Sequence, residues 1–88
     1  MVNDASYRLD GQKGMVIGGA GGIGRTIAVG LAAAGSDVAI ADLSSRASAM
    51  AEVAEEARAQ GAQAMEIAID VTCIPSIEQA VARMVEEF

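Results

Sequence analysis

Short apolar runs alternate with amphipathic segments along the chain, which is the pattern of strands followed by helices. The apolar runs that predict strands lie at 13–17, 37–42 and 64–69. Apolar residues recur at helical spacing in the segments 23–34, 44–60 and 76–88. This β-α-β-α-β-α order predicts an α/β fold with parallel strands, right-handed crossovers and helices on both faces of the sheet.

The middle apolar run is the clearest of the three. Val38, Ala39, Ile40 and Ala41 are consecutive and apolar, as is typical of a parallel strand buried on both faces. A central second strand predicts the order 3-2-1, which is half of a doubly wound, Rossmann-like fold in three layers.

Two predicted helices begin with residues that commonly cap helices. Ser44 or Ser45 is placed to cap the second helix, and Ser76 with Gln79 forms a capping box for the third, just after Pro75. The apolar faces of these two helices follow from residues about one turn apart. They are Met50, Val53, Ala54 and Ala57 in the second helix, and Ile77, Val81, Met84, Val85 and Phe88 in the third.

Composition limits the size and class of the protein. The 88 residues are 52% apolar, which predicts one small domain with a core built from aliphatic side chains. We divide the chain into an N-terminal arm at 1–12 and a partial Rossmann-like domain at 13–88. A domain of this size has a poor ratio of buried to exposed surface, so we expect marginal stability.

Charge and residue usage exclude several functions. A chain with a net charge of −6 lacks the basic surface that nucleic-acid binding needs. No apolar run is long enough to span a membrane, and the first residues do not resemble a signal peptide. With no histidine and a single cysteine, we expect no metal site and no internal disulfide. Cys73 is predicted to be an inert, partly buried thiol. These features together favour the cytoplasm.

A glycine-rich turn between the first predicted strand and helix is the strongest candidate site. Gly19-x-Gly21-x-x-Gly24 fits the dinucleotide fingerprint, and Gly18-x-x-x-Gly22-x-Gly24 fits the spacing of short-chain dehydrogenases. Glycines let backbone N–H groups and a helix N-terminus approach a pyrophosphate. The glycines alone leave open a flexible or tightly packed turn without a ligand.

Two aspartates follow the second and third strands, at the edge where open α/β sheets bind ligands. Asp42 lies eighteen residues after Gly24, where a carboxylate accepts from the adenosine ribose; the alternative is a loop aspartate or a helix cap. Asp70 is placed to accept from the adenine amino group, or else only ends a strand. A carboxylate at Asp42 repels a 2′-phosphate, which favours NAD over NADP, and Arg25 and Arg46 are interpreted as solvated helix residues.

These motifs resemble the N-terminal part of the short-chain dehydrogenase/reductase family, in the family's order and with its spacings. The matching positions are Gly18, Gly22, Ile23, Gly24, Asp42, Asp70 and Val71. The resemblance covers the chain from about residue 9 onward. It implies that the four turn residues line the pyrophosphate, that Asp42 binds the ribose, and that Asp70 and Val71 surround the adenine.

The resemblance also has departures. The family usually has threonine where this chain has Ile17, and its catalytic serine and Tyr-x-x-x-Lys pair are absent here, since the only tyrosine is Tyr7 in the arm. We therefore predict no catalytic residues and no dehydrogenase activity from these 88 residues alone. The chain is interpreted as the NAD-binding part of an oxidoreductase, and the alternative is a non-catalytic dinucleotide-binding module that works with a partner chain.

Association is the last expectation from the sequence. In the order 3-2-1 the first strand has one unpaired edge, which invites pairing with another strand. We expect self-association or a complementary C-terminal chain.

A different Rossmann enzyme, such as a flavoprotein, is disfavoured by Gly18 and by Asp70-Val71.

Overall fold

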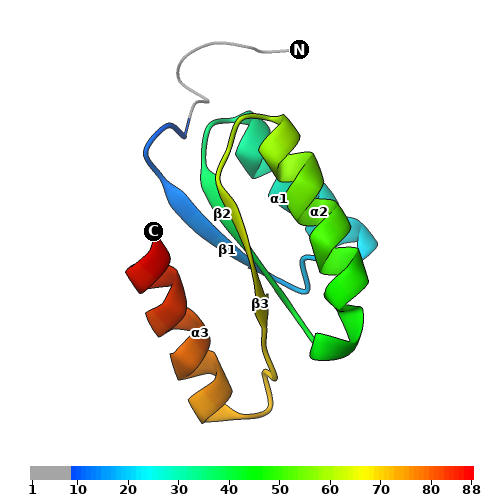
Figure 1. Ribbon diagram of the computed structural model, residues 1–88, viewed down its shortest axis with the longest axis vertical. Helices are drawn as coiled ribbons and strands as arrows, with labels where there is room; N and C mark the ends of the chain where they lie inside the picture. Colours follow the sequence, from blue (N-terminus) through cyan, green and yellow to red (C-terminus); the bar gives the residue numbers. More distant parts are fainter. Residues whose placement is uncertain (1–8) are drawn as a thin grey trace.

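A computed structural model describes residues 9–88 as one parallel three-stranded sheet with helices on both faces (Figure 1). Most of the predicted arm at 1–12, Tyr7 included, lies outside the described residues. The elements are β1 (Lys13–Ile17), α1 (Gly22–Ala33), β2 (Asp37–Asp42), the 3-10 turn η2 (Ser44–Arg46), α2 (Ala47–Ala59), β3 (Ala64–Ala68) and α3 (Ile74–Glu87). Their bounds lie within a few residues of the predicted ones.

The sheet order is β1-β2-β3, which confirms the predicted order 3-2-1. Both pairs are parallel, with Val16 opposite Ile40 and Ile40 opposite Glu66. Helices α1 and α2 cover one face and α3 lies on the other, so the three-layer arrangement is also confirmed (Figure 1).

The core is centred on β2. Its residues Val38 to Ala41 are fully buried, because β2 has a strand on each side and helices above and below. Val16, Val38 and Ile40 pack under α1 and α2. The predicted inner face of α2 is confirmed, since all four of its residues are buried. They are Met50, Val53, Ala54 and Ala57.

The prediction for α3 is only partly right. Ile77, Met84 and Phe88 pack beside the core on the second face of the sheet, but Val81 and Val85 are 49% and 75% exposed. The helix contacts the sheet through a narrow strip, and within residues 9–88 nothing covers the rest of its apolar side. Helical periodicity identifies an apolar face but not how much of it finds a partner.

Both predicted caps are wrong, for a common reason. Ser76 lies inside the first turn of α3, and its hydroxyl oxygen accepts the backbone N–H of Asp70 at 2.9 Å. Cys73 is the residue before this helix, and it is exposed rather than partly buried. The η2 turn delays the start of α2, which has no side-chain cap. In each case a serine does lie near the start of a helix, but its hydroxyl does not accept an N–H group of that helix's first turn.

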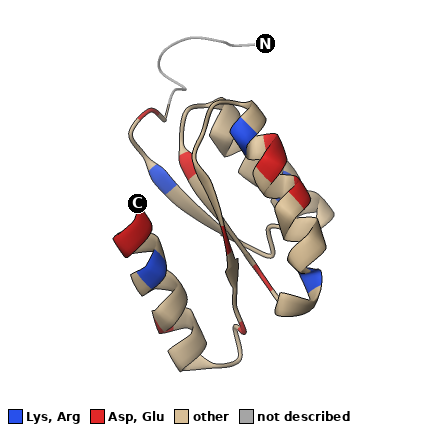
Figure 2. Cartoon of the chain, viewed as in Figure 1, with Lys and Arg blue, Asp and Glu red and all other residues tan. Residues whose placement is uncertain are grey.

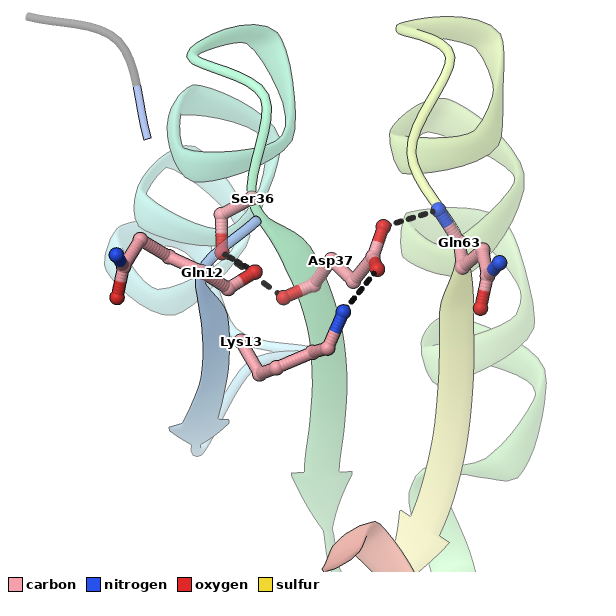
Figure 3. Close-up of polar contacts among 5 residues, drawn as sticks. All are labelled: Gln12, Lys13, Ser36, Asp37 and Gln63. Atoms are coloured by element: carbon pink, nitrogen blue, oxygen red, sulfur yellow. Dashed lines mark hydrogen bonds and ion pairs between the residues drawn. The ribbon is translucent and has the colours of Figure 1, made fainter. Parts of the chain in front are cut away.

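A polar cluster joins the strands at their amino ends (Figure 3). One carboxylate oxygen of Asp37 accepts the Gln63 backbone N–H at 3.0 Å, and the other pairs with the Lys13 ammonium at 2.9 Å. The buried Ser36 hydroxyl is hydrogen-bonded to the carbonyl oxygens of Gln12 and Asp37. The N–H of Gln63, and then Lys13, hold the pKa of Asp37 below its ordinary value.

We expect an Asp37→Asn chain to lose less stability in acid than the unchanged chain. A carboxyl group with a lowered pKa in the folded state contributes stability that is fully present above its unfolded pKa of about 3.9. That contribution is lost as the pH falls through the lower, folded value. Free energies of unfolding from urea titrations at pH 6 and pH 3 measure the difference. Glu78→Gln is the control, and an equal acid loss in all three chains would contradict the assignment.

One edge of the sheet is open. Residues of β1 pair with β2 on one side, and on the other side no strand within residues 9–88 pairs with them. Ile17 at the end of β1 is 54% exposed. No helix in this described part of the chain is long and apolar enough to cross a membrane.

Candidate functional site

Three parallel strands bring their carboxyl ends to one edge of the sheet, and a groove of about 320 Å³ lies there. Its lining consists of Ile17, Gly18, Asp42, Leu43, Ile69, Asp70, Val71 and Thr72. Four of the predicted site residues thus come together from three separate loops. Gly22, Ile23 and Gly24 do not line this groove; they form the first turn of α1.

The turn after β1 is tied to the neighbouring strand. Gly18 has a positive φ of 78°, a conformation that favours glycine, and this turns the chain away from the sheet. The N–H groups of Gly18 and Gly19 both donate to the carbonyl oxygen of Ala41, at 2.8 and 3.2 Å. The N–H of Gly21 donates back to the Gly18 carbonyl oxygen. The turn is therefore held in place without the threonine for which Ile17 stands.

Gly24 is where α1 crosses this turn most closely. A Cβ atom there would overlap the Gly18 carbonyl oxygen and would lie 2.9 Å from the Gly19 Cα atom. Only glycine fits between the helix and the turn. A Cβ on Gly22 would meet no atom within 4 Å, so the first residue of α1 faces open space.

The start of α1 carries a partial positive charge, and its own first turn has neither a side-chain cap nor an acidic residue to offset it. The first N–H groups of a helix have no acceptor within the helix, and here the cap residue Gly21 has no side chain to supply one. The first turn contains no acidic residue. This arrangement suits an anion that brings its own oxygen acceptors.

Asp42 links the end of β2 to the glycine turn. One of its carboxylate oxygens accepts the backbone N–H of Ala20 at 3.1 Å, and the other accepts the N–H of Leu43 at 2.8 Å. The Asp42 side chain is only 11% exposed. A carboxylate has about four acceptor positions, so hydroxyl donors in the groove can still bind.

Arg46 is not the freely solvated residue that the sequence suggested. Its Nε atom lies 3.5 Å from the Asp42 carboxylate, and its Nη2 donates to the Ala20 carbonyl oxygen at 3.2 Å. Arg25 also has a partner, because its guanidinium pairs with Glu56 of α2. No signal in the sequence indicated the first contact, because Asp42 ends β2 and Arg46 ends the η2 turn, so their spacing of four is not that of two residues on one helix.

Asp70 orders the loop after β3. Its Oδ1 accepts both the hydroxyl of Thr72, at 2.6 Å, and the Thr72 backbone N–H, at 2.9 Å. These two bonds hold the pKa of the exposed Asp70 carboxyl below its ordinary value. Val71 is 55% exposed and lines the groove next to it. Thr72 was not singled out from the sequence, although an aspartate followed two residues later by threonine is a common turn pattern.

Charged side chains are spread over the fold rather than gathered into one basic surface (Figure 2). Among residues 9–88 no group of three or more histidine, cysteine, aspartate or glutamate side chains is placed to hold a metal ion. The groove is therefore best described by its two carboxylates and its apolar walls.

Comparisons with known proteins identify the family and the fold of this chain. The profile of the family described as short chain dehydrogenase matches residues 13–88. Hydroxynaphthalene reductase arp2 of Aspergillus fumigatus is 42% identical over an alignment of 89 positions, which covers all of this chain and 32% of that protein. A crystal structure of a dehydrogenase/reductase from Sinorhizobium meliloti 1021 superposes with a TM-score of 0.89 at 35% identity, over 94% of this chain and 32% of that one.

A short-chain type dehydrogenase/reductase from Mycobacterium marinum gives a similar result. Its crystal structure has a TM-score of 0.85 at 32% identity, over 92% of this chain and 32% of that one. The chain thus spans about a third of the length of the relatives that it matches.

Proposed function

This chain belongs to the short-chain dehydrogenase family, and from that premise we propose that it binds the adenosine and pyrophosphate portions of NAD for an oxidoreductase. The observation that carries the proposal is the meeting of the glycine turn, Asp42 and Asp70 at one edge of the sheet. NAD, when bound, supplies a hydride acceptor and NADH a hydride donor.

The residues fit such a cofactor in three places. The start of α1 offers backbone donors and open space at Gly22 for a pyrophosphate. Asp42 offers acceptor positions to the ribose hydroxyls, and Val71 and Asp70 offer an apolar wall and a carboxylate to the adenine. Each of these contacts binds or orients the cofactor, and none of them moves a proton. We propose that substrate recognition and the chemical step need the further length that the relatives have, and that the chain is located in the cytoplasm.

We expect the chain to bind NAD more tightly than NADP, because the Asp42 carboxylate repels a 2′-phosphate. Asp42→Asn keeps an acceptor for the Ala20 N–H but removes the charge, so NAD affinity should fall by about 1 kcal/mol, or about fivefold, and the preference for NAD should shrink. Isothermal titration calorimetry with both cofactors measures this.

Asp37→Asn makes the same chemical change at the opposite end of β2, and it should leave both affinities unchanged. Tighter binding of NADP by the unchanged chain would overturn the assignment of Asp42 to the ribose. Equal effects of the two substitutions would mean that Asp42 acts only through stability.

We also propose that the open edge of β1 is an association surface. The exposure of apolar side chains favours this second proposal. Apolar side chains stay exposed on β1, on α1 and on α3, and α1 packs against β1. They include Ile17, Ile27, Val81 and Val85. A second copy of the chain can pair with this edge about a two-fold axis and extend the sheet.

A further inference from the structure

The outer edge of β1 presents a definite set of backbone groups. The carbonyl oxygen of Gln12 and the N–H of Gly18 both bond to β2, so the even-numbered residues from 12 to 18 turn toward that strand. The two backbone polar groups of a strand residue lie on the same side of the strand, and this side alternates from one residue to the next. The groups of Lys13, Met15 and Ile17 therefore face the outer edge.

The side chains of these three residues share the face of the sheet that α3 covers. Met15 packs beside the core cluster under α3, whereas Val16 is buried under α1 and α2. Ile17, at the carboxyl end of β1, is 54% exposed. A pocket of about 290 Å³ lies beside the amino end of the strand, and its walls are Lys13, Met84, Val85 and Phe88. One end of β1 thus carries an exposed apolar side chain, and the other end carries a largely apolar pocket.

Antiparallel pairing of two copies of β1 brings these two ends together. With Met15 opposite its counterpart on a two-fold axis, Lys13 of each copy lies opposite Ile17 of the other. Every outward-facing residue of β1 then exchanges backbone hydrogen bonds with a facing residue, whereas a shift by two residues leaves one of them without a facing residue in β1. An axis perpendicular to the sheet keeps α3 of both copies on one face, so each Ile17 points toward the pocket of the other copy.

The other outer strand, β3, is protected against the same pairing. The Ala64 carbonyl oxygen at its start already accepts an N–H of Arg58 at 2.9 Å. Glu66 is the middle residue of β3. Pairing two copies of β3 about this residue would set two glutamates opposite each other, and like charges directly opposite are destabilising. In the pairing of β1, each Lys13 faces Ile17 instead, so no like charges meet.

We propose that Ile17 of each copy fills the pocket beside Phe88 of the other, in an antiparallel pair of β1 strands centred on Met15. The contact removes from water the isoleucine side chain and part of Val85, which is 75% exposed in the single chain. It also joins two three-stranded sheets into one continuous sheet. This inference rests on the proposed association surface at β1, and it is independent of dinucleotide binding.

Cysteine cross-linking tests the register, in chains whose single native cysteine is removed by Cys73→Ser. One chain carries Lys13→Cys and a second carries Ile17→Cys, which places the two sulfurs on facing residues. Their Cα atoms would lie about 5.5 Å apart, a separation that suits a disulfide. Mild oxidation of the mixture should give a covalent dimer on non-reducing electrophoresis. Either chain alone should give none, because equivalent residues would lie about 13 Å apart along the strands.

Glu66→Cys in the same background is the control for β3, and it should not cross-link. The pocket contact has its own test, since Ile17→Ala should raise the dimer dissociation constant at least about tenfold through two lost apolar contacts per dimer. Ile74→Ala truncates another exposed isoleucine, at the start of α3, and should leave that constant unchanged. Sedimentation equilibrium gives the constants, and thermal unfolding reports whether each chain is folded.

The outcomes separate the register from the association surface. Folded chains that dimerise without a cross-link in the mixture, or in which each chain cross-links only with itself, would overturn this register and keep association through β1. An unchanged dissociation constant for Ile17→Ala would overturn the pocket contact. Cross-linking of Glu66→Cys alone, or chains that stay monomeric at every concentration, would overturn both proposals.

Discussion

A Gly24→Ala chain is expected to be destabilised by about 3 kcal/mol and to lose its dinucleotide binding. The added Cβ would overlap the Gly18 carbonyl oxygen and press on Gly19. The turn has little freedom to move away, because its N–H groups are bonded to Ala41 of the central strand. The strain therefore falls on the contact between α1 and the turn, where the start of the helix faces the proposed pyrophosphate site.

Gly30→Ala is the control within the same helix. A Cβ there meets no atom within 4 Å, so the substitution should stabilise the chain by about 0.5–1 kcal/mol through helix propensity alone. Urea unfolding gives both free energies, and calorimetry with NAD gives the affinities. If Gly24→Ala were as stable as Gly30→Ala, the close approach of helix and turn would not exist in solution.

Chains of residues 1–88 are expected to associate through β1, with a melting temperature that rises with protein concentration. For a folded dimer in equilibrium with unfolded monomers, each tenfold increase in concentration adds about 1.4 kcal/mol per mole of dimer. The physical cause is the outer edge of β1, with which no strand within residues 9–88 pairs, together with exposed Ile17. Light scattering and a concentration series of melting curves measure the effect.

Ile17→Lys should shift this equilibrium toward the monomer, because a lysine on an edge strand opposes pairing with a second strand. Ile74→Lys places the same charge on another exposed isoleucine, at the start of α3, and should leave association unchanged. A compact monomer whose melting temperature is independent of concentration would refute the proposal that a second copy pairs with β1. Binding of a separately supplied chain that matches the C-terminal part of the relatives, with no self-association, would assign the edge to that chain instead.

The fold followed closely from local patterns. Strands, helices and their order were correctly predicted because the apolar run at Val38 to Ala41 admits few positions other than the centre of a parallel sheet. The buried face of α2 followed from helical spacing alone, since residues about one turn apart must share a side.

The site was predictable to a lesser degree. Gly18, Asp42 and Asp70 could be assigned to one edge because the carboxyl ends of parallel strands meet there, and the structure brings them into one groove. Their roles toward NAD stay predictions. The sequence predicted glycine at 24 only as part of the fingerprint motif. The atoms that exclude a side chain there belong to Gly18 and Gly19, and only the structure shows how close they lie.

What the sequence determined by itself is therefore the set of elements, their order and the edge that carries the candidate site, because these depend on periodicity and on residues close together in the chain. Only the tertiary structure decided that Arg46 lies against Asp42, that Ser76 accepts the N–H of Asp70, and that α3 leaves Val85 exposed. Each of these depends on the direction and distance between separately folded elements, which a one-dimensional pattern of apolar and polar residues does not specify.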